Sequence, residues 1–191
     1  SHDIKINDVD IGASDSASAA AKAIAINTVS SSTNVTASGS NIVTLTLNFS
    51  EASAASSNIS INGNAINFSS VTNEADTITA INNASIGDIV ASTNSSGEVQ
   101  LASASGADIV IAHGGTAGVF FDGHIDASGA TIAVGSSVTF KGQILLTHTA
   151  GDVIKISGDD VGELGFQAQA SSSAAVPGSI ISVSSSSNAT S

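Results

Sequence analysis

The 191-residue chain contains no cysteine, methionine, tryptophan or tyrosine and a single proline. Without cysteine it forms no disulfide and supplies no thiol, so cysteine nucleophiles, redox pairs and thiolate metal ligands are excluded. The lack of methionine and the opening Ser1-His2 lead us to expect a fragment of a longer protein, with Ser1-His2 consistent with a cleavage scar.

Positive charge is also scarce. Four lysines and no arginine stand against sixteen acidic residues, which gives a net charge of −12. Such a surface repels the phosphates of nucleic acids and of anionic lipids, so we expect no nucleic-acid partner. No apolar run is long enough to cross a bilayer and nothing at the start reads as a signal peptide, so we expect no membrane insertion.

Aromatic residues make up only 3% of the chain, and Ser, Thr, Asn and Gly fill much of the remainder. This composition alone is typical of a linker or a low-complexity tract. However, 41% of the residues are hydrophobic, and Ile, Val and Leu recur in short alternating runs that disordered polar tracts lack. The sequence therefore predicts a folded, β-rich chain with few large core residues.

One segment of the chain occurs twice. Ile4-Lys5-Ile6-Asn7-Asp8 opens the first copy and Ile59-Ser60-Ile61-Asn62-Gly63 opens the second, and Ala-rich stretches close on Ile26-Asn27 and Ile81-Asn82. The differences 59 − 4, 61 − 6 and 81 − 26 all equal 55. A constant spacing between the opening strand and the closing helix indicates a duplicated supersecondary unit.

Each copy is predicted to be a strand-helix-hairpin module. In the first, residues 3–50, we expect Ser14 or Asp15 to cap a helix that runs to about Val29. A hairpin would follow, with strands at 35–38 and 43–49 and a turn at 39–41.

The second module, residues 51–112, repeats this order. Its helix is expected from about Asn73 to Asn83, capped by Thr72 or Asn73, with acidic residues in the first turn. Further strands are expected at 89–92, 99–102 and 109–111.

Residues 113–170 are predicted to be β only, and residues 171–191 form a Ser-rich return strand or linker around 180–183. The candidate strands of the β-rich region are separated by glycine turns and lie at 119–121, 131–134, 137–140, 143–146 and 153–156. The expected fold class is therefore α+β, mostly antiparallel.

Two kinds of residue group in the sequence suggest metal sites. A metal site could be formed by three histidines and three aspartates: His113, His124, His148, Asp122, Asp126 and Asp152. Their spacing fits no short ligand motif, so we expect the histidines to be ordinary loop or turn residues. Two groups of acidic residues near glycine suggest calcium ligands: Asp8 with Asp10, and Asp159 and Asp160 with Glu163. Neither has the ligand order of an EF-hand loop, so we expect them to be solvent-exposed residues of turns. We expect no metal and no cofactor.

Catalytic motifs are not evident. Residues 114–118 have the glycine count of a phosphate-binding loop but no following lysine, which favours an ordinary turn. Serine is so abundant that pairing one with a histidine is unspecific, and there is no G-x-S-x-G elbow. We therefore expect a protein that is not an enzyme.

The repeated segment resembles the hook-IN motif of bacterial flagellins and some hook-associated proteins. In the first copy the resemblance rests on residues 4–12, the Ala-rich helix to Asn27 and residues 35–38. In the second it rests on residues 59–63, 79–82, 90–92 and 97–101. The first copy departs from the motif at Asp8, where glycine is usual. Residues 151–158 and 164–166 are similar to the end of an outer flagellin region.

The resemblance implies the surface-exposed outer domain of a flagellar filament subunit, because the long helical heptads that assemble the filament core are not in this sequence. It implies other flagellin subunits as partners, an extracellular location, a structural role in motility and an isolated fragment that is monomeric. It also implies O-glycosylation on exposed hydroxyls, with Ser95, Ser96, Ser171, Ser172 and Ser173 as candidates. The alternative is a secreted bacterial adhesin or glycan-binding surface module; a secreted enzyme would need converging polar groups in a pocket.

Overall fold

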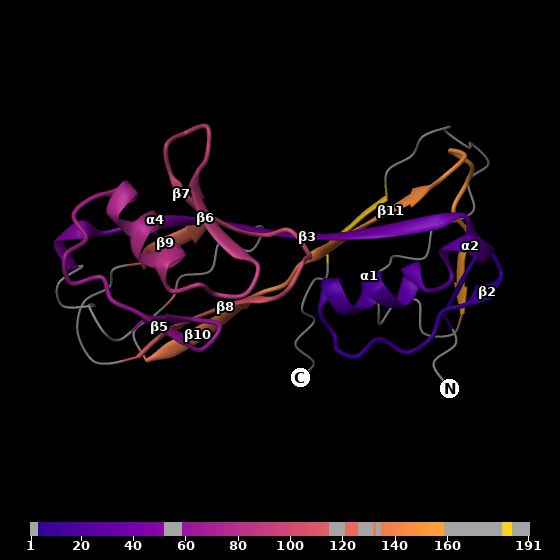
Figure 1. Ribbon diagram of the computed structural model, residues 1–191, viewed down its shortest axis with the longest axis horizontal. Helices are drawn as coiled ribbons and strands as arrows, with labels where there is room; N and C mark the ends of the chain where they lie inside the picture. The colour runs from indigo at the N-terminus through magenta and orange to yellow at the C-terminus, as the bar shows by residue number, and fades with distance from the viewer. Residues whose placement is uncertain are drawn as a thin grey trace. The chain divides into compact units, whose positions relative to one another are not determined.

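The structure is a computed structural model that describes residues 4–51, 59–114, 121–125, 132, 135–158 and 181–184 (Figure 1). The chain divides into two compact units. The first unit contains Ser1–Ser40, Ser105–Ala107 and Lys141–Ser191, and the second contains Asn41–Ala104 and Asp108–Phe140. Each unit thus combines residues from more than one of the modules expected from the sequence.

The first unit consists of two small antiparallel sheets and two helices. Strand β1 (Ile4–Ile6) lies between β2 (Val9–Asp10) and β12 (Ile156–Gly158). The first half of β3 (Val35–Leu47) pairs with β11 (Gln143–His148), which also pairs with β13 (Ile181–Ser184). For residues around 180–183 the sequence allowed either a return strand or a linker, and β13 is a strand.

Helix α1 (Ala19–Asn27) packs against β3 and β11 within this unit (Figure 1). Its buried residues are mostly alanines, whose small side chains let the helix backbone lie close to the strands. The core of the unit comprises Ile6, Ala19, Ala23, Ile26, Val35, Ala37, Ile144, Leu146 and Ile154. A second short helix, α2 (Ser30–Thr33), leads into β3.

The start of α1 differs from the expectation. Ser18 caps the helix by accepting a hydrogen bond from the N–H of Ala21, so the predicted caps Ser14 and Asp15 were wrong. The hydroxyl of Ser14 instead donates to the carbonyl of Ser16, which forms a local turn ahead of the helix. Several serines in a row offer competing local hydrogen bonds, and the sequence does not indicate which one begins the helix.

The hairpin expected at residues 35–49 was also wrong, because β3 is one continuous strand of 13 residues. Gly39, the predicted turn residue, lies against another backbone segment: a Cβ atom at Gly39 would be 1.9 Å from the carbonyl oxygen of Ser105. Asn41 is buried and donates from Nδ2 to the carbonyl of Phe140 at 2.8 Å. Glycine and asparagine at these positions therefore serve close packing and a buried hydrogen bond rather than a turn.

The second unit holds the rest of β3 and most of the other strands. Strands β4 (Ile59–Ile61), β5 (Asn64–Ile66), β8 (Ile109–His113) and β10 (Ser136–Phe140) form an antiparallel sheet in the order β10-β8-β4-β5. Residues 41–47 of β3 pair with β7 (Val99–Ser103) and with β9 (Phe121–Ile125), and β7 pairs with β6 (Ile89–Thr93). A short 3-10 helix, η1 (Phe49–Glu51), follows β3.

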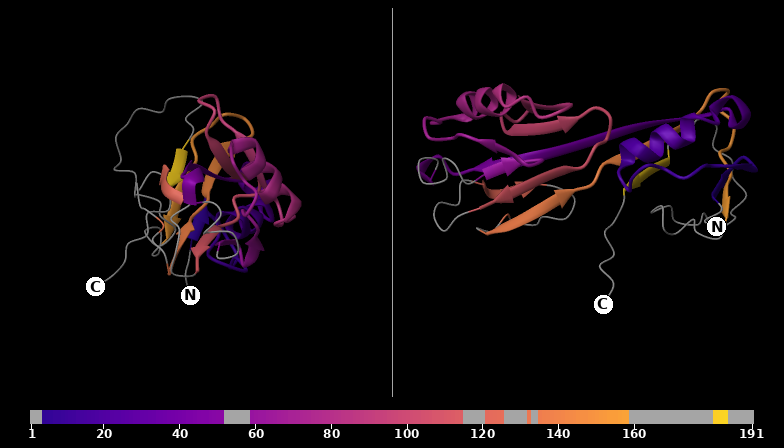
Figure 2. Two further views of the ribbon diagram at one scale, coloured as in Figure 1. Left: turned by 90° about the vertical axis from the view of Figure 1, so that its left-hand side faces the viewer. Right: turned by 60° about the horizontal axis from the view of Figure 1, so that its bottom comes forward.

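Helix α4 (Glu74–Asn83) lies against β6 and β7 (Figure 2). Asn73 caps it by accepting from the N–H of Asp76, and Glu74 and Asp76 lie in its first turn, as the sequence predicted. The larger core of the chain lies in this unit and includes the fully buried Phe68, Leu45, Ile59, Ile61, Ile66, Ile81, Leu101, Ile109 and Ile111.

The fold is thus a mixed α+β arrangement of antiparallel sheets, as predicted. The strands expected at 89–92, 99–102, 109–111, 137–140 and 143–146 are confirmed, whereas the one expected at 153–156 begins only at Ile156. β9 begins at Phe121, and the strand expected at 131–134 falls mainly outside the described residues. No helix in the described part of the chain is long and apolar enough to cross a membrane.

Candidate functional site

Asn7 and Asn62, the asparagines of the two Ile-x-Ile-Asn segments, occupy matching positions in their units. Both lie just after a strand with positive φ, 50° for Asn7 and 48° for Asn62. Asparagine tolerates this left-handed conformation better than most residues. Each then bonds a residue on the neighbouring strand or leading into it.

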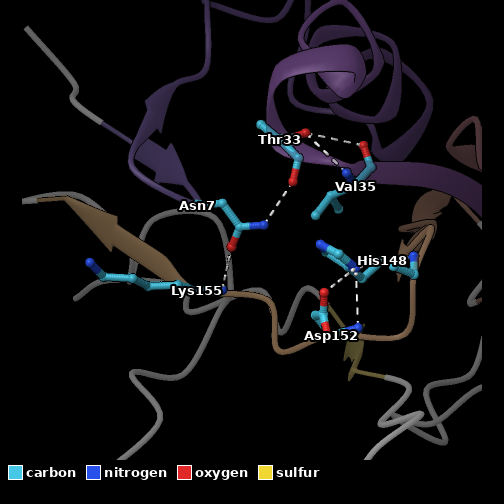
Figure 3. Close-up of polar contacts among 7 residues, drawn as sticks. Asn7, Thr33, Val35, His148, Asp152 and Lys155 are labelled. Carbon is cyan, nitrogen blue, oxygen red and sulfur yellow. Dashed lines mark hydrogen bonds and ion pairs between the residues drawn. The ribbon is translucent and has the colours of Figure 1, made fainter.

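Asn7 bonds the backbone of Lys155 twice. Its N–H donates to the Lys155 carbonyl at 2.8 Å, and its Oδ1 accepts from the Lys155 N–H at 2.9 Å. Its Nδ2 also donates to the carbonyl of Thr33 at 2.8 Å (Figure 3). The side chain therefore joins the turn after β1 to the segment before β12 and to the end of α2.

Asn62 makes the two corresponding backbone bonds in the second unit, to Val110, whereas its Nδ2 has a partner that is not the counterpart of Thr33. Its N–H donates to the Val110 carbonyl at 2.8 Å, and its Oδ1 accepts from the Val110 N–H at 2.6 Å. Its Nδ2 donates to the carbonyl of Asp108 at 3.0 Å. The two asparagines thus have equivalent backbone partners, Lys155 and Val110.

Asn27 and Asn82, which lie in the last turns of α1 and α4, form a second matching pair. Asn82 donates from Nδ2 to the carbonyl of Ala91 at 3.0 Å and accepts at Oδ1 from the N–H of the same residue at 2.8 Å. Asn27 does the same to Ala37, with both distances 2.8 Å. Each carboxamide therefore hydrogen-bonds both the backbone N–H and the backbone C=O of one residue in the strand that follows its helix.

These contacts reveal a further correspondence that sequence reasoning missed. Leu146 pairs with Ala37 and Leu101 pairs with Ala91, so Leu146 and Leu101 are equivalent, as are Lys155 and Val110. The differences 146 − 101 and 155 − 110 both equal 45, and Gly106 and Gly151, also 45 apart, both have positive φ. The signal was present in the sequence as Gly106 to Ile111 against Gly151 to Ile156, but at a spacing other than 55.

His148, a candidate metal ligand, is held by the turn that follows β11 (Figure 3). Its Nδ1 accepts from the N–H of Ala150 at 3.2 Å and from that of Asp152 at 3.1 Å, and the Asp152 carboxylate lies 4.0 Å away. An acceptor role for Nδ1 places the proton of the neutral ring on Nε2. His148 thereby orders the turn that follows β11.

The other candidate ligands form no metal-binding group in the part of the chain that the structure describes. His113 is buried in β8, and no group of three His, Cys, Asp or Glu side chains able to hold a metal occurs among the described residues. Asp122 and His124 lie in β9, of which only the backbone is described, and the remaining candidates lie outside the described residues: Asp126, Asp159, Asp160, Glu163 and 115–118.

The acidic pair Asp8 and Asp10 meets lysines. Asp8 Oδ1 lies 2.7 Å from Lys155 Nζ, and Asp10 Oδ1 lies 3.1 Å from Lys5 Nζ. Both ion pairs are exposed, so each contributes little to stability. Each carboxylate is therefore oriented toward an ammonium group rather than toward the other carboxylate.

Ser95 and Ser96 lie exposed in the turn between β6 and β7. Asn94 orders this turn, because its Oδ1 accepts from the N–H groups of Ser96 and Glu98 at 2.9 and 3.0 Å. Both serine side chains are thus exposed on a turn that Asn94 orders. The other glycosylation candidates, Ser171, Ser172 and Ser173, lie outside the described residues.

An open groove of about 470 Å³ lies in the second unit between β5 and α4. Its lining is uncharged except for Asp76, whose Oδ2 already accepts from the N–H and hydroxyl of Thr72 and from Asn73 Nδ2. The groove is lined by Ala65, Ile66, Asn67, Ser70, Val71, Asp76, Thr79, Ala80, Asn83 and Ala84. None of these is an aromatic residue on which a sugar ring or a base would stack. The one charged group of the groove, Asp76, is therefore engaged in the first turn of α4.

No family model matches the chain, and no curated protein matches it at a significant level.

Proposed function

We propose that the chain is the outer, surface-exposed domain of a bacterial flagellar filament subunit, with a structural role and no catalytic one. In this proposal its partners are other subunits of the same filament, its location is extracellular and the isolated fragment is monomeric. The proposal takes up the resemblance of the repeated segment to the hook-IN motif.

The observation that carries the proposal is the pairing of the motif asparagines. Asn7 with Asn62 and Asn27 with Asn82 make the same backbone hydrogen bonds in their two units. A chance similarity in a sequence rich in Ser, Thr and Asn would not reproduce two sets of contacts at matching positions. The residues on which the resemblance rests are therefore residues that build the fold, as those of a structural motif are.

We further infer two modules, one interrupting the other. The second module would contain residues 59–113 with a hairpin of β6 and β7. The first would contain residues 4–40 and 143–158, with β3 and β11 as the corresponding hairpin, whose tip is replaced by the chain of the second unit. This differs from two consecutive modules at 3–50 and 51–112 because the first needs β11 and β12 for completion.

The composition supports the same role. A chain with no cysteine and few large core side chains suits export in the unfolded state, and a surface dominated by Ser, Thr and Asn remains hydrated when many copies are displayed together. The adhesin alternative would be favoured by an exposed groove with aromatic side chains, and the groove beside α4 has none.

The coding sequence on both sides of this segment tests the proposal. A filament subunit must carry long amphipathic helices at both ends that assemble the filament core. We expect heptad-patterned segments immediately before and after residues 1–191. Signal peptides, wall anchors or further β-domains in those places would contradict the filament role and favour a surface adhesin.

A further inference from the structure

Among the described residues, strand β6 and the first half of β3 each have one edge without a neighbouring strand. Within the described residues β6 pairs only with β7, and residues 35–40 of β3 pair only with β11. An open edge presents N–H and C=O groups to which a strand of another molecule can pair. Edges of natural sheets are commonly defended by lysine, by proline or by charge.

Neither edge has these defences. The segments are Val-Thr-Ala-Ser-Gly-Ser at 35–40 and Ile-Val-Ala-Ser-Thr at 89–93, without a charged residue or a proline. Val90 is 57% exposed, which leaves a large apolar side chain on the edge strand. Short, uncharged segments with β-branched residues are the type that adds to other strands most readily.

The hydrogen bonds of both edges are instead occupied from within the molecule. On β6, the N–H of Ile89 donates to the carbonyl of Ile86 at 2.9 Å, and Asn82 takes both backbone groups of Ala91. Because alternate residues of an antiparallel strand direct their backbone groups to the same side, Ile89 and Ala91 together make up most of this edge.

The edge of β3 is occupied in the same way. Thr33 Oγ1 accepts from the N–H of Val35 at 3.1 Å and lies 3.4 Å from its carbonyl oxygen (Figure 3). Asn27 takes both backbone groups of Ala37 at 2.8 Å. Backbone groups at two equivalent positions are therefore hydrogen-bonded in both units, at Val35 and Ala37 of β3 and at Ile89 and Ala91 of β6. Because the sequences of the two units differ elsewhere, this agreement indicates that the bonds have the same role in both.

We propose that Asn27 and Asn82 are edge-closing residues that prevent β3 and β6 from pairing with a strand of a second copy of this chain. The carboxamide presents one acceptor and one donor at the spacing of a peptide group, so it stands in for the missing strand. In a chain with four lysines and one proline, this side chain takes the place of the usual edge defences. The inference holds whether or not the protein belongs to a filament.

The test is self-association of the full chain carrying Asn82→Ala, with Asn83→Ala as the matched control on the same helix end. Sedimentation velocity over a concentration series measures association, and circular dichroism measures folding. We expect the association constant of Asn82→Ala to exceed that of wild type by about tenfold or more, as one net intermolecular hydrogen bond or more at the freed edge would give. Asn83→Ala should behave as wild type.

A rescue variant separates edge closure from a purely stabilising role. Thr93→Pro blocks strand addition at the same edge, because the N–H of residue 93 points away from β7 and is not needed in the ladder. Asn82→Ala/Thr93→Pro should return to the monomer while remaining as destabilised as Asn82→Ala. A monomeric Asn82→Ala with only a lower melting temperature would overturn the proposal.

If Asn82→Ala does not fold, Asn27→Ala decides the question in the other unit. It frees both backbone groups of Ala37 at the edge of β3 and adds no charge that would itself defend the edge. A folded Asn27→Ala that associates more than wild type supports edge closure, and one that stays monomeric at all concentrations contradicts it.

Discussion

Gly39 and Gly106 are in direct backbone contact within the first unit. A Cβ atom on Gly106 would lie 2.8 Å from the Cα of Gly39, and one on Gly39 would lie 2.8 Å from the carbonyl carbon of Ser105. Neither position has room for a side chain, so both require glycine. Gly106 in addition has φ of +80°, a conformation that side chains disfavour.

Gly39→Ala should therefore destabilise the first unit by about 1–3 kcal/mol, the usual cost of forcing an extra methyl group into a packed site. Urea unfolding followed by circular dichroism measures the change. Gly12→Ala is the control, since no atom lies within 4 Å of a Cβ there and φ is not positive. Equal stability of the two variants would show that the strand at Gly39 can move away from Ser105 at little cost.

Asn7→Ala and Asn62→Ala should each lower stability by about 2–3 kcal/mol. Each removes two side-chain hydrogen bonds to backbone groups and leaves an alanine in a left-handed conformation. Because each asparagine serves one unit, amide hydrogen exchange should report faster opening around β12 for Asn7→Ala and around β8 for Asn62→Ala. Identical exchange patterns in both variants would contradict separate, equivalent roles.

The turn between β6 and β7 should accept an insertion. In the first unit the corresponding hairpin of β3 and β11 already carries the chain of the whole second unit at its tip. A flexible Gly/Ser segment of about ten residues placed between Ser95 and Ser96 should cost less than about 1 kcal/mol, because closing a longer loop is inexpensive.

The control places the same segment between Asn62 and Gly63, where it displaces Asn62 from Val110 and Asp108. We expect that variant to lose the β4–β8 pairing and most of the stability of the second unit, as thermal unfolding would record. Similar melting temperatures for the two insertions would argue against the equivalence of the two hairpins.

O-glycosylation can be examined on protein from its native source. If the turn hydroxyls are modified, the tryptic or Glu-C peptide containing Ser95 and Ser96 should be heavier than its sequence mass by the mass of a sugar. Replacement of both serines by alanine should remove that species without changing the melting temperature, because both side chains are exposed. An unmodified mass for the native protein would refute this prediction.

The sequence predicted those parts of the fold that rest on local chemistry. The cap of α4 follows from Asn73 with acids at 74 and 76, and the strands of β6, β7 and β8 follow from clean alternation. The continuous β3 was missed because Gly39 and Asn41 are typical turn residues, and their actual roles depend on Ser105 and Phe140, which are distant in the sequence.

The roles of the asparagines illustrate the same limit. The Ile-Asn pairs at 26–27 and 81–82 are evident in the sequence as a repeat, and asparagine near a helix end is locally typical of a cap or a turn. Their bonds to Ala37 and Ala91 depend on where a later strand lies, which periodicity does not reveal. The equivalence of β11 and β12 with β7 and β8 was hidden for a related reason, because about a hundred residues separate β3 from β11.

Immunogold electron microscopy of flagellar filaments tests the filament role most directly. Filaments would be sheared from cells that express the full gene product, purified, and labelled with antibodies raised against this chain. We predict gold particles at regular intervals along the whole filament surface, and none on filaments of a strain from which the coding segment is deleted. Labelling confined to the cell wall or the medium, with bare filaments, would contradict the assignment of this chain to the filament exterior.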